Sequence, residues 1–450
     1  MGNYLLDLFM KQIFGQPFLL MAIIVFIGYM AMRASLSKAI MGAVKASIGI
    51  LAMGVGSGAL IKNFGFLLTA INNATGLQGA GLNTYPTMTN AYEKMDAVLG
   101  DGTGASWGIY VLLIGFLFNL GLVALRKYTH IRAVYLTGNA MIVQAGISTY
   151  IVWRFLGLGM VPTILIAAAI TALYWGICST LLIKPTHEIT NADFTVAHQQ
   201  MFMDWVAYKV APRIGDPKKD DIEKKKMPKS LNFLQDSIIA TALVMFVSAA
   251  IIMIVAGPEQ VAWLRGEEAF NVAGYKNYVV LLIYIAFILT ADIVILLNGV
   301  RMFVGELMAS FKGISEKLLP GAVAGVDCAA IFAFAPKSVV LGLIFGAIGQ
   351  IIGVVGLLVF KSPIFLVPGF IPLFFDNATI SIFANKFGGW KASAVICTLN
   401  GLIQILGSAL AVAMMDMSWW QGSADYATIW VGIIGIFKLI GKLFGIPIAG

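Results

Sequence analysis

Charged residues are scarce in this chain of 450 residues: only 12% are Asp, Glu, Lys or Arg, whereas 59% are hydrophobic. Soluble globular domains carry about 25% charged residues, and the mean hydropathy here is +0.88. These values exclude a soluble protein and indicate an integral membrane protein. The longest polar stretch, residues 184–230, is too mixed in character to form its own core. We therefore expect a single membrane domain over residues 1–450 in which this stretch is a cytoplasmic loop.

Cysteine and histidine are also rare, with three of each. Cys178, Cys328 and Cys397 lie in or beside apolar runs without paired spacing, which argues against a disulfide framework or a metal site. The P-loop, HExxH and GxSxG patterns are absent. The sequence therefore predicts no catalytic residues, no metal and no cofactor. Energy for any transport would come from an ion gradient or from another protein.

The net charge of +8 does not indicate nucleic-acid binding, because the basic residues lie in short loops beside apolar runs. Residues 209–229 contain eight Lys or Arg, whereas residues 257–277 contain two. Cytoplasmic loops are enriched in these residues, so the first loop is predicted inside and the second outside. Counting spans from these loops places the N-terminus outside and the C-terminus in the cytoplasm.

Nine apolar runs approach the ~20 residues that a bilayer-spanning helix needs. They are residues 17–32, 43–61, 107–125, 160–183, 231–256, 278–297, 338–360, 392–415 and 427–444. Two further runs, 134–153 and 364–385, are apolar but interrupted. Together they predict an all-α polytopic membrane protein with about 11 transmembrane helices, some of them broken or re-entrant. The GVGSG motif around Gly56 is expected to serve helix packing rather than phosphate binding.

The interrupted segment 365–391 is the most unusual part of the chain. Pro372 breaks an apolar run. Asp376 and Asn385 follow at membrane depth, where contact with lipid would make such polar side chains energetically costly. Such segments persist at membrane depth only when they are buried in protein or line a wet cavity. Its motif FDNATISIFAN resembles TGNAMIVQAG at residues 137–146. Paired interrupted segments are typical of a transporter substrate site built from inverted repeats.

A second pair of similar short segments, SKAIMGAV at residues 37–44 and SEKLLPGAV at 315–323, supports the repeat. Chance similarity between short apolar sequences is the alternative, because such matches are frequent.

Three polar residues are the strongest ligand candidates. His198 and Gln199 offer donors and acceptors within one turn, which suits a polyhydroxylated ligand; a helix-end histidine bonded to backbone is the alternative. Asp327 lies among small residues, where a carboxylate needs a partner or a cavity. It either accepts hydrogen bonds from a ligand or caps a broken helix. Asp292 is the other intramembrane acid, which suits either an ion-coupled carrier or a local polar network.

The weaker candidate ligand residues are uncharged. Asn139 and Gln144 lie in a glycine-interrupted segment, where amides suit either hydroxyl recognition or repair of broken backbone. Thr84 and Tyr85 combine a hydroxyl with a flat ring, as in many sugar sites, but a turn before Pro86 would explain them equally.

Several long motifs resemble the membrane component, enzyme IIC, of the ascorbate-type phosphotransferase system. They are LTGNAMIVQAG, YWGICSTLLIKPTHEIT, AHQQMFMDWVAYKVAP, NGVRMFVGEL, ISEKLLPGAVAGVDCAAIFAFAP and PGFIPLFFDNATISIFANKFGGWKA. The resemblance extends from about residue 9 to residue 420 in unbroken order.

The resemblance implies a homodimeric permease of the bacterial inner membrane with eleven spans. A scaffold domain (the V-motif) would pair the protomers, and a core domain built from inverted repeats would carry the sugar by alternating access. A separate phosphocysteine IIB protein, charged through IIA, would phosphorylate the sugar at the cytoplasmic face, so the chain itself would not be an enzyme.

The family's ligand positions carry over to six residues: Thr84, Tyr85, Gln144, His198, Gln199 and Asp327. Two further positions depart from the ascorbate pattern, because this chain has Asn139 in place of a histidine and Val143 in place of a glutamine. The substrate is therefore expected to be L-ascorbate or a close sugar-acid or polyol relative. The alternatives are an ion-coupled secondary transporter of a small polar solute and, last, a membrane enzyme acting on a lipid-linked sugar.

Overall fold

The computed structural model describes residues 17–76, 78–100, 102–225, 236–317, 319–369, 371–415 and 417–445. Within these ranges, seven helical segments are long and apolar enough to cross a membrane. They are α3 (Leu36–Thr75), α5 (Thr103–Ala124), α8 (Met160–Leu181), most of α12 (Ser237–Arg265), the first part of α13 (Tyr278–Lys317), α14 (Pro336–Val359) and the continuous η5–α15 segment (Pro372–Asp376 and Asn377–Met415). The chain is thus a mostly helical, multi-pass membrane protein.

The remaining predicted spans are also helical. The first coincides with α2 (Pro17–Ala31), a shorter apolar helix, and the last coincides with α16 (Ala424–Phe444). The interrupted run at 134–153 becomes a strand followed by α7 (Gly138–Leu156). Residues 231–235 of the predicted span 231–256 lie outside the described ranges.

Residues 184–225, expected to be a loop, are largely structured. They contain α9 (Ile183–Thr190, which begins one residue earlier), a short strand, α10 (Met201–Ile214), α11 (Pro217–Asp220) and the 3-10 turn η2 (Ile222–Lys224). Side chains of α10 such as Asp204 are fully buried. Short helices α4 (Thr84–Leu99), α6 (Arg126–Thr129) and η4 (Cys328–Phe334) complete the described elements.

Two small parallel sheets are a feature that the expectation of an all-helical chain missed. One contains β5 (Ile364–Val367), β1 (Gln78–Leu82) and β6 (Trp419–Trp420), in that order; the other contains β2 (Ala133–Tyr135), β4 (Val323–Val326) and β3 (Phe194–Val196). Each strand has only two to five residues. That length is too short for an alternating pattern to be recognised, and the paired segments are far apart in sequence.

Each strand leads into a helical segment. Strand β1 precedes α4, β2 precedes α7, β3 precedes α10, β4 precedes η4, β5 precedes η5, and β6 precedes α16. Because strands within each sheet run parallel, the residues that follow them gather at one edge of that sheet. This arrangement is what positions the candidate site.

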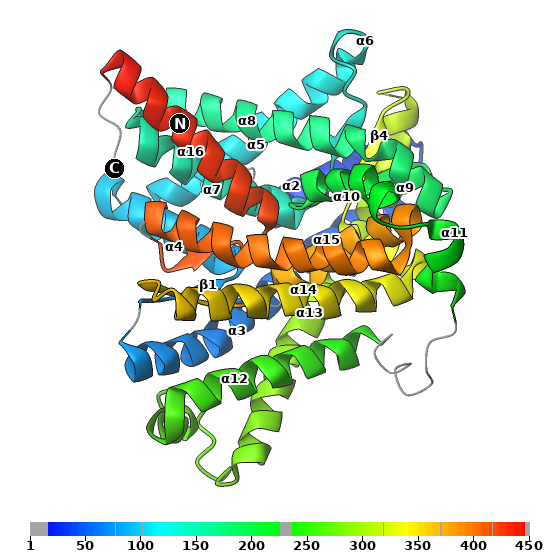
Figure 1. The fold of residues 1–450 in the computed structure, drawn as a ribbon. Helices are drawn as coiled ribbons and strands as arrows, with labels where there is room; N and C mark the ends of the chain where they lie inside the picture. The colour runs from blue at the N-terminus through cyan, green and yellow to red at the C-terminus, as the bar shows by residue number, and fades with distance from the viewer. Residues whose placement is uncertain are drawn as a thin grey trace.

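The long helices form distinct packing groups. Helices α2, α3, α12 and α13 pack on one another, whereas α5, α7 and α8 form another group, and α14 packs along α15. In Figure 1, α12 and α13 lie at the bottom, α14 and α15 in the middle, and α5 and α8 near the top.

Glycines allow α3 and α13 to approach closely. A Cβ atom on Gly56 would lie 2.4 Å from the backbone nitrogen of Leu296, and one on Gly49 would lie 2.7 Å from that of Phe303. Gly58 of the same GVGSG motif meets nothing within 4 Å. The packing interpretation of the motif is therefore confirmed at Gly56 and not at Gly58.

Asp292 on α13 is part of the same helix contact. The Nδ2 of Asn63 on α3 donates a hydrogen bond to Asp292 Oδ2 at 2.8 Å. The interpretation of Asp292 as part of a local polar network is thereby confirmed, because its partner is an amide on the neighbouring helix.

We predict that Gly56→Leu lowers the stability of the folded protein, because a side chain there collides with the backbone of α13. Overpacking of this kind costs about 1–3 kcal/mol. Thermal unfolding in detergent would show a lower Tm for Gly56→Leu, whereas Gly58→Leu, which extends into open space, should unfold like the wild type. An equal Tm for the two variants would contradict this account of the helix contact.

Candidate functional site

His198 and Asp327 lie close together because they follow neighbouring strands. Val196 of β3 is in register with Val326 of β4, and Ala197 N–H donates to the carbonyl of Val326 at 2.7 Å. His198 and Asp327 are the second and first residues beyond these paired positions. Both are buried, with 5% and 2% of their surfaces exposed.

The imidazole of His198 is held by two neighbours. Its Nδ1 lies 2.5 Å from Oε1 of Gln200, and its ring stacks on Phe375 with centroids 6.1 Å apart. An amide oxygen only accepts hydrogen bonds, so Nδ1 donates in this contact, and in the neutral imidazole Nε2 is then an acceptor. The alternative of a helix-end histidine bonded to backbone is not what the structure shows, since the partner is a side chain.

Asp327 does cap a broken helix. Its Oδ1 accepts a hydrogen bond from the backbone N–H of Ala329 at 2.9 Å, at the start of η4. Donor atoms of His198, Asp327 and Cys328 lie within 4.8 Å of one another, all three residues being buried. The sequence predicts no metal, and among the described residues this cluster alone has the composition of a metal-ligand set.

Thr84 and Tyr85 connect the two sheets. They follow β1, where Asn83 caps α4 by accepting a hydrogen bond from Tyr85 N–H at 3.2 Å. Gln199 Nε2 donates to Thr84 Oγ1 at 3.4 Å, which joins the residue after β1 to the residues after β3. The side chain of Tyr85 interacts with that of Asn139, at the start of α7. It also interacts electrostatically with the carboxylate of Asp327.

Six of the eight predicted site residues are therefore brought together: Thr84, Tyr85, Asn139, His198, Gln199 and Asp327. The other two, Val143 and Gln144, are fully buried on α7. Gln144 Oε1 accepts a short hydrogen bond from Trp175 Nε1 on α8, and Trp175 stacks on Tyr135. In the described part of the chain, Gln144 makes no hydrogen bond to the other six residues, and Val143 has no polar side-chain group with which to make one.

Several residues of the site were not predicted. Gln200 orients His198, and the carbonyl of Gln199 accepts hydrogen bonds from Tyr174 at 2.9 Å and Ser423 at 3.1 Å. Phe375 belongs to the interrupted segment whose polarity marked it in the sequence. No local pattern distinguishes Tyr174 on α8 or Ser423 at the N-cap of α16, since both are distant in sequence and meet Gln199 only in the folded chain.

The chemical character of this cluster is that of a binding site. It combines an imidazole acceptor, a carboxylate, amide and hydroxyl groups and aromatic rings, which suit a small polyhydroxylated molecule. Lining groups of this kind recognise hydroxyls without carrying out a reaction themselves.

Comparisons with known proteins agree with this character. A family model described as the phosphotransferase system sugar-specific permease component matches residues 12–436. The ascorbate-specific phosphotransferase system EIIC component of Mycoplasma pneumoniae is 30% identical over 455 aligned residues, which cover 93% of this chain and 67% of that protein. Components of this type are permease subunits, and separate IIA and IIB proteins transfer the phosphoryl group. The chain therefore belongs to the family of sugar-specific permease components of the phosphotransferase system.

Proposed function

We propose that this protein takes up L-ascorbate, or a close sugar-acid or polyol relative, and that separate IIB and IIA proteins phosphorylate it. The observation that carries the proposal is the convergence of Thr84, Tyr85, Asn139, His198, Gln199 and Asp327 at the ends of strands from two sheets. The name of the Mycoplasma relative supports ascorbate as the substrate.

The proposed site recognises the substrate through complementary hydrogen bonds. Nε2 of His198 accepts from one hydroxyl and the Asp327 carboxylate accepts from another, while Oε1 of Gln199, which is buried without a hydrogen-bond partner, accepts a third. The Tyr85 ring provides a flat face. A buried acceptor without a partner, such as Gln199 Oε1, favours a ligand that supplies a donor, because leaving it unpaired costs about 1–3 kcal/mol.

Transport requires this site to face each side of the membrane in turn. We assign α2, α3, α12 and α13 to the scaffold (V-motif) domain that pairs two protomers, and the sheets with their helices to a moving core. Both proposed inverted repeats would then contribute an interrupted segment: 137–146 follows β2 and 375–385 follows β5. The second pair supports the repeat less, because 37–44 lies within α3 whereas 315–323 runs from α13 into β4.

The proposed topology places the N-terminus outside and the C-terminus in the cytoplasm of a bacterial inner membrane, with about 11 crossings. A phosphocysteine IIB protein would meet the permease at the cytoplasmic face. An ion-coupled carrier is the second candidate, but Asp292, the acid that favoured it, is engaged by Asn63 in the α3–α13 contact.

We predict that His198→Ala and Asp327→Asn weaken binding of radiolabelled L-ascorbate to the purified protein by about tenfold to hundredfold, as expected for hydrogen bonds to charged or polar ligand groups. Asparagine is itself a good N-cap, so Asp327→Asn should retain the start of η4. Asp292→Asn is the matched control, being the same substitution at an intramembrane acid outside the site. Wild-type affinity in both site variants would refute the assignment.

Substitutions at position 139 test the identity of the substrate. Ascorbate is an anion near neutral pH, so we predict that Asn139→His increases ascorbate affinity about threefold to tenfold at pH 6, where imidazole is largely protonated, and much less at pH 8. Asn139→Gln retains a neutral amide and should show no such pH dependence. If the wild type binds xylitol or galactitol more tightly than ascorbate, the substrate is a polyol rather than ascorbate.

The coupling mechanism is tested in proteoliposomes. We predict that labelled ascorbate accumulates as its phosphate ester only when phosphoenolpyruvate and the IIA and IIB proteins are enclosed, and that Na⁺ or H⁺ gradients alone give no accumulation. Gradient-driven uptake without phosphoenolpyruvate would support the ion-coupled carrier instead.

A further inference from the structure

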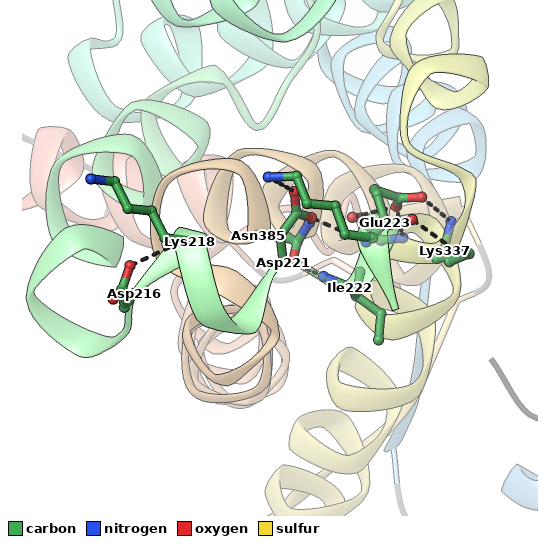
Figure 2. A network of polar contacts seen from close by, with 9 residues as sticks. Asp216, Lys218, Asp221, Ile222, Glu223, Lys337 and Asn385 are labelled. Atoms are coloured by element: carbon green, nitrogen blue, oxygen red, sulfur yellow. Dashed lines mark hydrogen bonds and ion pairs between the residues drawn. The ribbon is translucent and has the colours of Figure 1, made fainter. Parts of the chain in front are cut away.

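Residues 215–225, here called the strap, cross the start of α14 and the middle of α15 (Figure 2). Asn385 on α15 makes two hydrogen bonds with the strap. Its Nδ2 donates to Asp221 Oδ1 at 2.8 Å, and its Oδ1 accepts from Ile222 N–H at 2.9 Å. A single amide thus ties both a side chain and the backbone of the strap to α15.

Glu223 attaches the strap to α14. Ala335 at the N-cap of α14 provides no side-chain cap, and Oε1 of Glu223 accepts from Ser338 N–H at 2.7 Å and Ser338 Oγ at 2.8 Å instead. Lys337 Nζ donates to the carbonyls of Glu223 and Lys225, both at 2.8 Å. The strap therefore caps the helix from outside and is held in a defined position (Figure 2).

Asp220 holds the middle of the strap against the break in α15. Its carboxylate lies 3.0 Å from Lys391 Nζ, and Lys391, together with Lys225, lowers the pKa of Asp220. Gly389 has a φ of +76°, and a Cβ there would lie 2.5 Å from Asp220 Cβ. The helix break at Gly389 thus makes room for the strap.

The acidic groups of the strap are all engaged by neighbouring groups. Asp220 pairs with Lys391 and Lys225, Asp221 with Asn385 and Lys224, Glu223 with Ser338, and Asp216 with Lys219 and the backbone N–H of Lys218. Cations remain in excess at this surface. Among the described residues, the exposed cations without an ion pair are Lys218 on the strap, Lys209 and Arg213 on α10, and Lys386 on α15.

This cationic surface is connected to the candidate site by two helices. Helix α10 begins directly after Gln200, and its 14 residues span about 20 Å. Helix α15 begins just after Phe375, on which His198 stacks. The two helices pack against each other, and the rings of Tyr208, midway along α10, and Phe387 on α15 are 4.6 Å apart.

We propose that the exposed cations around the strap form the docking surface for the phosphorylated IIB protein, an inference that rests on the proposed function. A partner that carries a phosphoryl group brings concentrated negative charge, and a preformed cationic surface attracts it over long range. Because the surface and His198 lie at opposite ends of α10, the bound substrate must become accessible from the strap side before the phosphoryl group reaches it.

The test compares two charge reversals in the full-length protein. Lys218→Glu combined with Lys386→Glu alters the proposed surface without touching the strap's attachments. Lys127→Glu on α6 is the matched control, because Lys127 is also exposed and is predicted on the same side of the membrane. For each variant we would measure the Kd for purified, phosphorylated IIB protein in detergent, and separately the Kd for L-ascorbate.

We expect the double variant to bind IIB at least about fivefold more weakly at low salt, with the difference shrinking at high salt because screening weakens exposed charges. Ascorbate binding should be unchanged. Equal IIB affinity in the double variant and in Lys127→Glu would overturn the docking surface. A defect that appears only in vesicles with anionic lipids would assign the cations to headgroups and overturn it as well. Failure of the wild type to bind IIB at all would instead overturn the proposed function.

Discussion

Backbone that leaves a helix inside a membrane must find hydrogen-bond partners within the protein, and this requirement shapes the molecule. The two three-stranded sheets meet it by pairing segments from distant parts of the chain, such as β1 with β5 and β3 with β4. Each pairing satisfies broken backbone and at the same time brings together the residues that follow the strands. The site is therefore a consequence of how the breaks are stabilised.

Side-chain amides bond to the free backbone groups at a helix break where no strand pairing does so. At the π-helical turn η5, Gln404 Nε2 donates to the carbonyl of Pro372 at 3.0 Å, and Asn377 Nδ2 donates to that of Leu373 at 3.1 Å. Gln350 on α14 donates to Gln404 Oε1 at 2.9 Å, which links the turn to the neighbouring helix. These buried amides thus have a structural use near the site.

The same helices that leave the site also build the outer surface around the strap. Helices α10 and α15, which begin shortly after His198 and Phe375, pack against each other, with the rings of Tyr208 and Phe387 in contact. Through such a rigid connection, a conformational change at one end of the helices displaces the other end, since packed helices move as units rather than deforming continuously. The attachment of Glu223 to α14 includes a third long helix in that unit.

The sequence by itself determined the class of the protein and most of its helices, because scarce charge and runs of ~20 apolar residues are direct consequences of a lipid solvent. It also marked His198, Gln199 and Asp327 as candidate ligand residues, since polar groups are costly in apolar surroundings unless they have partners or a ligand. Only the tertiary structure decided which candidates meet. Gln144 is hydrogen-bonded to Trp175, Asp292 to Asn63 and Gln200 to His198. The sequence pattern could not predict these pairs, because the partners lie on separate helices or in a local turn without periodicity. The strands were likewise decided by long-range pairing, which a short segment cannot encode alone.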